Sequence, residues 1–598
     1  MNKFFVGSMV VSLLSVLVAL AEEAPEEVIE GGGGQEPAAP ERYTATILPG
    51  GTKTYTNPEH WSTGNVPDGY HVDVVIDNDS TQNTTVNFLV GANTSYTNGT
   101  LIVDAGDSIT YKINNSTGSS GHNWWMTSIT NRGSFIIDGR IGKNDQSATV
   151  HAEDAPLYNE QGAVLKIQNA IGGYRGSHYL RVPLDGSVNK GEIEISGGSA
   201  RASNSQLNFL GAEGGVFLNE GTVLVRPSGN YTQSNVGSVG ISFPGPTILR
   251  GNGSIWLDND RKAPNGSVTA KLTGPGMTKP LVIGEGQTIK GDGLIDQFYL
   301  HNYGIIRSEG TNAVMKIQMT SWRNTECVVT NEASGCIIAN SSRGILLNTR
   351  VPGDVGERPS WNARFINLGL LESRTGSQIR FCDGINTTST KTGDGNLDRF
   401  DIEYLELWGR IAGGGQFVTP RRVYIGDGAR LMPGDLANTD GTGESTCGTI
   451  TFPRLVLREP AAIPDSEETT SGAITEFQCR KPEAGKYDSV WVNGDATVAG
   501  TLRFLRQPKA GTYPLFTSTG TLTCDLSALK IDLADGVNAP KLRLNTAATY
   551  TVEEPVLDEV SGEPVLDEET GLPKTQTVEM PCQRLEATWV GGFTVFVR

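Results

Sequence analysis

Alternating hydrophobic and polar positions run through the chain from about residue 43 onward. Short segments of Val, Ile and Leu with polar residues between them are separated by turns rich in Gly, Asn, Thr and Ser. A period of two predicts β-strands that each bury one face, and few stretches carry the 3.6-residue period of an amphipathic helix. We therefore expect an all-β protein.

One phrase recurs along this pattern. A hydrophobic residue precedes an asparagine, a glycine follows within a few positions, and an alternating strand comes next. The spacing of the copies is mostly near 30 residues, and the one interval of about 50 residues predicts a missed copy at IKGDGLIDQF, near Gly291 to Phe298. The recognised copies are centred on Asn131, Asn159, Asn189, Asn219, Asn252, Asn302, Asn331 and Asn367.

A repeat made of one turn and one short strand is typical of a solenoid, in which each coil stacks on its neighbour. The inward positions of stacked coils form ladders of Val, Ile and Leu, and Asn and Gly suit corners that need a positive φ. We expect an all-β fold, a single-stranded right-handed parallel β-helix with capping coils and protruding loops. The repeated asparagines are interpreted as corner residues rather than ligands.

The N-terminal segment predicts export. Lys3 supplies a positive charge, Phe4 to Leu20 is apolar, and Ala19-Leu20-Ala21 is a small-x-small cleavage site, so residues 1–21 are expected to be a signal peptide. We expect a secreted, cell-surface or outer-membrane-associated protein with no integral membrane segment after cleavage, because no later stretch has the roughly 20 apolar residues of a membrane span.

The remaining residues divide by composition. Residues 22–42 are acidic and rich in Pro and Gly, which is typical of a disordered linker. Residues 43–440 hold the β-helix repeats. Residues 441–598 are expected to form the terminal coils and a C-terminal β cap with an acidic loop at 553–571, where the sequence EPVLDE is duplicated.

Charge narrows the range of partners. The formal net charge is −18, which argues against nucleic acid and anionic lipid, since a phosphate-binding surface needs a positive excess. The seven cysteines lie in the C-terminal half, and in an exported chain some could be paired. Cys327 and Cys336 flank a turn-like NEASG, and Cys524 and Cys582 flank the acidic loop. No CxxC spacing indicates zinc.

Catalytic motifs are few. The sequence contains no Asp-Asp pair, no Gly-x-Ser-x-Gly and no His-Glu-x-x-His. No two histidines are spaced to share a metal on one helix or strand; the six are His60, His71, His122, His151, His178 and His301.

A weak calcium candidate is the run GDGNLDRFDIE, in which Asp394, Asn396 and Asp398 alternate as in the first half of a calcium loop. Arg399 stands where such a loop has its turn glycine, and Leu405 where it has a glutamate. A solvated turn is the simpler interpretation, and we expect no cofactor.

Aromatic residues suggest a different chemistry. His122, Trp124 and Trp125 follow a Ser/Gly-rich loop, and sugar rings stack on exposed indole faces, so these three are the glycan-binding candidates. Adjacent residues of a strand point to opposite faces. One tryptophan should therefore be buried and the other exposed.

Three stretches carry a family resemblance. TYTNPEHWSTGNVPDGYHVDVVI at residues 54–76, with Trp61, Gly64 and Pro67, resembles the opening coil of bacterial autotransporter passengers. IGDGARLMPGD (Ile425–Asp435) and YDSVWVNGDATVAGTLRF (Tyr487–Phe504) resemble later and terminal coils of the same proteins. The resemblance implies a secreted β-helix of the pectin-lyase-like type. The residues ending in FTVFVR do not resemble a translocator barrel, so none is expected.

Two functions remain open on these grounds. The first is a non-catalytic β-solenoid that acts as a surface adhesin, a scaffold or a glycan-binding protein, with polysaccharide or host and surface glycans as partners. The second is a divergent polysaccharide lyase or glycoside hydrolase of the pectin-lyase-like fold. Polygalacturonase-like and pectate-lyase-like motifs are missing, so we expect a protein that is not an enzyme.

Overall fold

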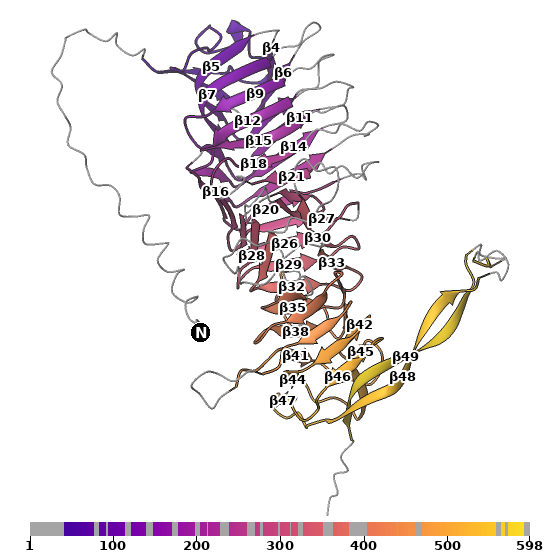
Figure 1. Ribbon diagram of the computed structural model, residues 1–598. Coiled ribbons are helices and arrows are strands. Elements are labelled where there is room, and N and C mark those ends of the chain that lie inside the picture. The colour runs from indigo at the N-terminus through magenta and orange to yellow at the C-terminus, as the bar shows by residue number, and fades with distance from the viewer. Residues whose placement is uncertain are drawn as a thin grey trace, which may run out of the picture. The chain divides into compact units, whose positions relative to one another are not determined.

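The computed structural model consists almost entirely of short strands wound into stacked coils (Figure 1). Arg42–Arg598 forms one compact unit. The structure describes residues 41–590 apart from 77–82, 91–93, 114–120, 139–146, 170–176, 198–203, 212, 228–238, 260–269, 275–278, 297–298, 311, 321–326, 351–362, 382–403, 439, 461–468, 558–563 and 568–571. The expected signal peptide and almost all of the expected linker lie outside these residues.

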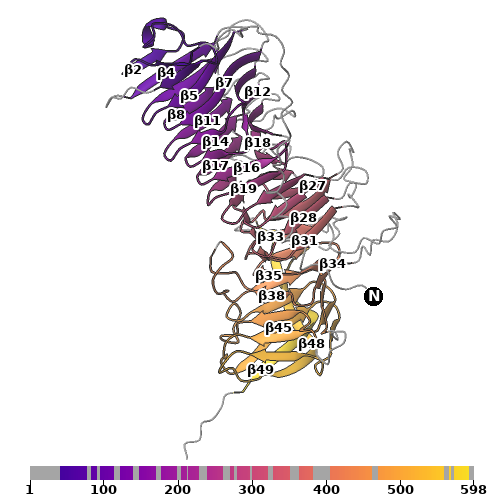
Figure 2. The same ribbon diagram turned by 90° about the vertical axis from the view of Figure 1, so that its left-hand side faces the viewer.

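From β9 onward each coil contributes one strand to each of three sheets, whereas the earlier coils contribute to two, and within a sheet each strand pairs in parallel with the strand of the next coil (Figure 2). This confirms the predicted parallel β-helix. The first sheet contains β1 (Tyr43–Thr46), β3 (Val72–Ile76), β5 (Ser95–Val103), β7 (Gly121–Asn131), β9 (Ser147–Ala152), β12 (Ser177–Pro183), β15 (Asn204–Leu210), β18 (Val239–Ser242), β21 (Ala270–Thr273), β24 (Leu294–Asp296), β27 (Met315–Thr320), β30 (Ile345–Arg350), β33 (Gln378–Phe381), β36 (Gln416–Val418), β39 (Thr449–Phe452), β42 (Ser489–Val492) and β45 (Gly511–Ser518).

The second sheet branches from the long strand β7, whose first half pairs with β9 and whose second half pairs with β10. It contains β10 (Leu157–Asn159), β13 (Ser187–Asn189), β16 (Gly215–Asn219), β19 (Thr247–Arg250), β22 (Pro280–Ile283), β25 (Tyr299–Asn302), β28 (Cys327–Asn331) and β31 (Ala363–Asn367). Later coils place a separate five-stranded sheet here: β34 (Tyr404–Leu407), β37 (Arg422–Ile425), β40 (Leu455–Leu457), β43 (Ala496–Val498) and β46 (Leu522–Cys524).

The third sheet runs the whole length of the stack. It contains β2 (Gly51–Thr54), β4 (Thr84–Val90), β6 (Ser108–Ile113), β8 (Ser134–Asp138), β11 (Val164–Asn169), β14 (Glu192–Gly197), β17 (Thr222–Pro227), β20 (Ser254–Leu257), β23 (Thr288–Gly291), β26 (Ile305–Ser308), β29 (Cys336–Ala339), β32 (Leu370–Ser373), β35 (Arg410–Gly413), β38 (Arg430–Pro433), β41 (Ile474–Phe477), β44 (Thr501–Phe504) and β47 (Lys530–Leu533).

The alternation seen in the sequence sorts side chains between the core and the surface. In β12 the residues His178, Leu180 and Val182 are buried, while Tyr179 and Arg181 face outward. Because neighbouring strands are in register, the inward positions form a continuous aliphatic ladder, and each fully buried rung contributes roughly 1.5–3 kcal/mol. One such ladder of the first sheet runs through Val150, Leu180, Leu207, Ile241, Leu272, Ile295, Ile317 and Leu347.

The repeated asparagines form buried amide ladders at the corner between the second and third sheets. Asn131 Nδ2 donates to Asn159 Oδ1 at 2.8 Å, and the same Nδ2 donates to the carbonyl of Val164 in the third sheet at 3.1 Å. Asn189 and Asn219 continue the series. The asparagines are therefore corner residues, as predicted, but they lie at strand ends and join two sheets through hydrogen bonds, whereas the left-handed corners are occupied by glycines.

A second amide ladder begins at Asn302 and continues through Asn331 and Asn367. Each ladder has a direction, because every Nδ2 donates to the next Oδ1. The first rung of each therefore has an oxygen with no donor, and these are the buried Oδ1 atoms of Asn131 and Asn302, which have no hydrogen-bond partner among the described residues.

A glutamine supplies the amide in the interval where the sequence predicted a missed copy. Gln287 is fully buried, and its Nε2 donates to the carbonyl oxygens of Asn219 and Gly251 at 2.7 and 2.8 Å, while its Oε1 accepts from Asn219 Nδ2 at 3.3 Å. The amide thus lies just before the predicted stretch, and Asn252 itself is not a rung. Asn252 lies in the turn between β19 and β20, so it is a corner residue, as predicted.

The glycine of every copy of the phrase except the Asn159 copy, where Gly162 has open space, is required by close packing of the coils. A Cβ atom on Gly221 would lie 2.0 Å from the carbonyl oxygen of Gly191, and a Cβ on Gly191 would lie 2.3 Å from that of Ala163. No side chain fits there. The backbones of successive coils therefore pack directly against each other at this corner.

Aromatic side chains close the first coils. Trp61 follows the short 3₁₀ helix η1 (Pro58–His60), is 2% exposed, and donates from Nε1 to the carbonyl of Tyr55 at 2.7 Å. Tyr55 stacks on Phe88 with ring centroids 3.8 Å apart. Trp61 and Tyr55, both in the stretch that resembles the opening coil of autotransporter passengers, thus cover the N-terminal end of the aliphatic ladders.

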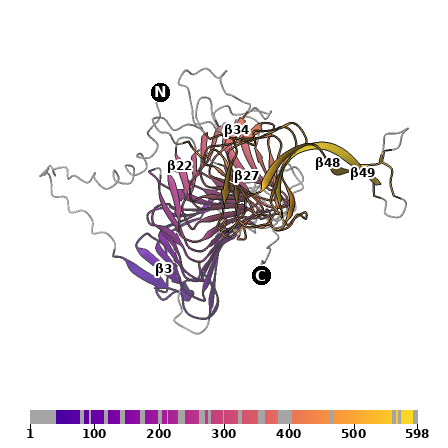
Figure 3. The same cartoon turned by 90° about the horizontal axis from the view of Figure 1, so that it is seen from below.

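The C-terminal end is covered by an antiparallel ribbon of β48 (Lys541–Pro555) and β49 (Thr575–Trp589). β49 pairs with β45, and the far part of the ribbon reaches away from the coils (Figures 1 and 3). The expected acidic loop begins inside β48, since Glu553 pairs with Thr577, and the duplicated EPVLDE copies form isolated bridges, Leu557 with Pro564 and Leu566 with Pro573.

A segment after β38 covers part of the outward face of the third sheet. Leu436 packs on Ile338, Leu370 and Ala412, which point away from the interior yet are fully buried. The backbone N–H of Leu436 donates to Glu372 Oε1 at 2.8 Å. Burial raises the pKa of Glu372 to about 7, although the N–H of Leu436 and the Arg374 guanidinium favour its charged form.

No helix among the described residues has the length and apolar character needed to cross a lipid bilayer.

Candidate functional site

The three glycan-binding candidates of β7 lie on different faces of the strand. Trp124 is fully buried, donates from Nε1 to Asn98 Oδ1 at 2.7 Å, and packs on Phe88 and Tyr111. His122 is also fully buried, and burial lowers its pKa. Neither side chain can contact a ligand at the surface, which corrects their assignment as glycan-binding residues. Trp125 points outward, as expected for one of two adjacent tryptophans.

Trp125 belongs to an outward stack that the sequence did not single out. Its indole lies parallel to the imidazole of His151 on β9, with ring centroids 3.7 Å apart and an interplanar angle of 11°. The two residues are direct neighbours in the ladder between β7 and β9. Because strands are spaced by about 4.8 Å, side chains at paired positions come into contact, and the two flat rings stack face to face, so that the imidazole covers one face of the indole.

Polar groups hold the stacked rings of Trp125 and His151 in place. His151 Nδ1 lies 2.6 Å from Glu153 Oε1, and His151 Nε2 lies 3.2 Å from Asn123 Oδ1. Arg181 Nε lies 3.4 Å from the same Glu153 oxygen. Burial lowers the pKa of His151, Glu153 opposes that shift, and Arg181 adds to it. These contacts fix the orientation of the His151 imidazole.

The same outward column continues with hydrogen-bonding side chains. His151 pairs with Arg181, and Arg181 pairs with Asn208 on β15. Asn208 Oδ1 is buried and has no hydrogen-bond partner among the described residues. Tyr179 stands in the adjacent outward column, where its hydroxyl accepts from Asn204 Nδ2 at 3.4 Å. We call Asn123, Trp125, His151, Glu153, Tyr179, Arg181 and Asn208 the Trp125 face.

This arrangement places the partly exposed indole of Trp125 beside a row of donors and acceptors. An indole face covers the C–H face of a sugar ring, and guanidinium, amide and phenol groups bond its hydroxyls. Both imidazole nitrogens of His151 already have polar neighbours, Glu153 Oε1 at Nδ1 and Asn123 Oδ1 at Nε2.

The calcium candidate cannot be placed. Asp394, Asn396 and Asp398 lie outside the described residues. Among the residues that are described, no group of three His, Cys, Asp or Glu side chains is arranged to hold a metal ion.

Neither of the two cysteine pairs that the sequence left open is formed. Cys336 is a buried free thiol, which excludes the bridge to Cys327. Cys524 and Cys582 are both free as well, so no disulfide ties down the acidic ribbon tip. Cys336, Cys524 and Cys582 each belong to a strand that pairs with strands other than the one holding the possible partner.

Sequence reasoning missed His151, Glu153 and Arg181 as partners of Trp125. They are separated from it along the chain, and only the pairing of β7, β9 and β12 brings them together. The signal that could have found them is the period-two alternation of the sequence, which places residues such as Arg181 on the outward face of their own strands. No protein-family model matches the chain, and no curated protein matches it either.

Proposed function

We propose that this chain is an exported, non-catalytic β-solenoid that binds glycans at the Trp125 face and serves as an adhesin or scaffold at a cell surface. The observation that carries the proposal is the outward Trp125 indole, held in place by stacking on His151, beside Arg181 and Asn208. Export rests on Lys3, the apolar run Phe4 to Leu20 and the Ala19-Leu20-Ala21 cleavage pattern. The autotransporter-passenger resemblance supports the same localisation.

One observation favours the alternative, a divergent polysaccharide lyase. Tyr179, His151 and Arg181 lie on the same face, and these residue types can act as base and acid in such enzymes. The contacts of both imidazole nitrogens weigh against it. Binding without turnover is the function that the geometry supports better.

The test is a glycan array probed with the purified protein and with Trp125→Ala. We expect binding to polysaccharide probes that weakens at least about tenfold in Trp125→Ala, which is a loss of about 1.4 kcal/mol. The matched control is Tyr158→Ala, which removes an exposed aromatic ring of the second sheet in the neighbouring coil and should bind as the unmodified protein does.

Two results would overturn the proposal. One is equal binding by Trp125→Ala and the unmodified protein, or no binding at all. The other is turnover: release of reducing ends, or of unsaturated products absorbing in the ultraviolet, would establish the enzymatic alternative.

A further inference from the structure

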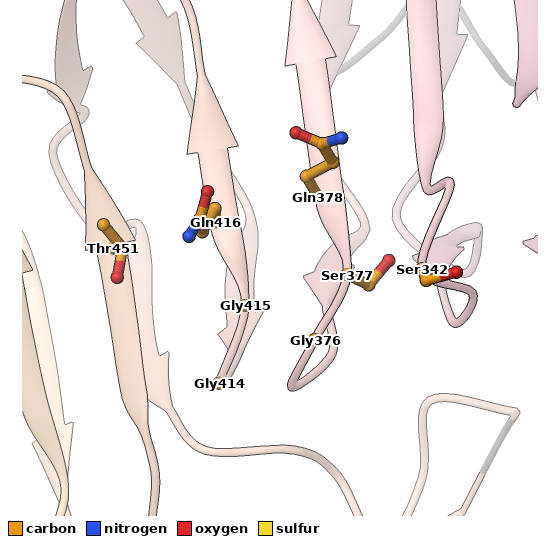
Figure 4. A pocket seen from close by; sticks show the side chains of 8 residues that line it. All are labelled: Ser342, Gly376, Ser377, Gln378, Gly414, Gly415, Gln416 and Thr451. Carbon is orange, nitrogen blue, oxygen red and sulfur yellow. The ribbon is translucent and has the colours of Figure 1, made fainter. Parts of the chain in front are cut away.

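A polar pocket lies at the corner where the third sheet passes into the first, at strands β30, β33, β36 and β39 (Figure 4). Its volume is about 290 Å³. Gln378, Gln416 and Thr451 project from three adjacent strands in a row, and Ser342 and Ser377 stand at the turns beside them. We call it the corner pocket. It belongs to later coils than the Trp125 face.

The lining is uncharged throughout. Besides the five amide and hydroxyl side chains, only the glycines Gly376, Gly414 and Gly415 line the pocket. Gly376 has a φ of +78°, and a Cβ there would meet no atom within 4 Å, so this corner is open. A neutral lining of this kind matches a ligand that presents many hydroxyl groups and no charge.

The lining amides are available to a ligand. Among the described residues, neither Gln378 nor Gln416 makes a side-chain hydrogen bond within the protein, and Gln416 is exposed. Each amide supplies donors and an acceptor. Ser377 is already committed, since its hydroxyl donates to the carbonyl of Ser341 at 2.7 Å. Gln378 and Gln416 therefore carry most of the free hydrogen-bonding capacity.

An aromatic ring continues the same row. Thr451 pairs with Trp491 on β42, so the indole is the next outward rung after the pocket. Its orientation is set by two contacts, a hydrogen bond from Nε1 to Asn493 Oδ1 at 2.7 Å and an edge-to-face contact with Tyr550 at 5.0 Å. A fixed, partly exposed indole beside free amides repeats the composition of the Trp125 face.

One carboxylate lies close to the turns that line the pocket. Asp435 Oδ1 accepts hydrogen bonds from the backbone N–H groups of Gly414 and Thr375, at 2.7 and 2.9 Å, directly behind the pocket wall. No lysine or arginine lines the pocket. A uronic acid would therefore meet this negative charge, and no cation among the lining residues would offset it.

We propose that the corner pocket is a second carbohydrate subsite, which takes a neutral pyranose unit through Gln378, Gln416 and Thr451 and stacks the adjoining unit on Trp491. The site is independent of the Trp125 face.

The test is isothermal titration of the full chain with neutral hexasaccharides of β-1,4-linked glucose, mannose and xylose, and with hexagalacturonate as the acidic comparator. We expect at least one neutral probe to bind, and Gln416→Ala and Trp491→Ala each to weaken that binding about tenfold or remove one site from the stoichiometry. Gln168→Ala, an outward glutamine of the third sheet, is the matched control and should have no effect.

The outcomes separate the two sites. Retention of the corner-pocket binding in Trp125→Ala supports the inference even if the glycan array contradicts the role of Trp125. Absence of binding by all three neutral probes overturns the inference, and so does tighter binding of hexagalacturonate. It is also overturned if Gln416→Ala and Trp491→Ala, with unchanged circular dichroism, bind the neutral probe as tightly as the unmodified protein does.

Discussion

Asn159 donates a hydrogen bond from its side-chain Nδ2 to the Oδ1 of Asn189, 2.7 Å away in the next coil. Both residues are buried at the corner of the stack, and thirty positions separate them along the chain. The same Nδ2 donates to the carbonyl of Glu192 at 3.1 Å, so one amide links two coils and two sheets.

Substitution Asn159→Ala is therefore expected to destabilise the helix by about 2–5 kcal/mol, because it leaves a donor on Asn131 and an acceptor on Asn189 without partners in a buried site. The measurement is the free energy of the first unfolding transition, obtained from urea denaturation. Lys190→Ala, an exposed neighbour, should change this free energy by no more than about 0.5 kcal/mol. Equal shifts for the two variants would show that the amide ladder does not hold the coils together.

Close packing at Gly221 predicts a more severe effect. In Gly221→Ala the new methyl group would lie 2.0 Å from the Gly191 carbonyl oxygen, so successive coils must separate. We expect loss of soluble folded protein. Gly162→Ala is the comparison, since its φ of +82° is strained for alanine but no atom lies within 4 Å, and it should cost only about 1–2 kcal/mol. Similar yields and midpoints for both would refute the packing argument.

The buried carboxyl of Glu372 predicts a pH dependence of stability. Its folded-state pKa of about 7 lies above the ordinary value of 4.5, so the folded state retains a proton that the unfolded state has lost between these pH values. Its stabilising contribution is complete below pH 4.5 and is lost as the pH rises through 7, to an extent of about 3 kcal/mol.

Glu372→Gln keeps an acceptor for the Leu436 N–H and removes the titration. Urea unfolding of both proteins at pH 5 and pH 8 should show a smaller loss of stability in the variant. Asp488, whose pKa burial raises to about 8, contributes a slope that both proteins share. Identical pH slopes would exclude Glu372 as the titrating group.

Two cysteines of neighbouring segments should differ in reactivity. Cys479 is fully buried and burial strongly raises the pKa of its thiol, whereas Cys447 is partly exposed, with its Sγ 3.4 Å from the carbonyl oxygen of Gln478. In the folded protein, iodoacetamide at pH 8 should alkylate Cys447 at least about tenfold faster, because the thiolate is the reactive form. Peptide mass spectrometry measures both rates, and in urea the two should converge. Equal rates in the folded protein would contradict the buried position of Cys479.

The sequence by itself determined that this protein is a parallel β-helix and which residues form its corners. Period-two alternation is local, and it places Leu180 inward and Arg181 outward whatever the neighbouring coil contains. Asn159 and Gly191 were recognisable because successive coils turn the same corner, so the same residue types recur there along the chain.

Only the tertiary structure decided which outward residues meet. Parity predicted that one of Trp124 and Trp125 would be buried, but the choice depends on the aromatic packing around Phe88. The juxtaposition of Trp125, His151 and Arg181 depends on register between strands, which the inward aliphatic ladder sets across coils of unequal length. Those contacts are long-range, so no local pattern in the sequence records them.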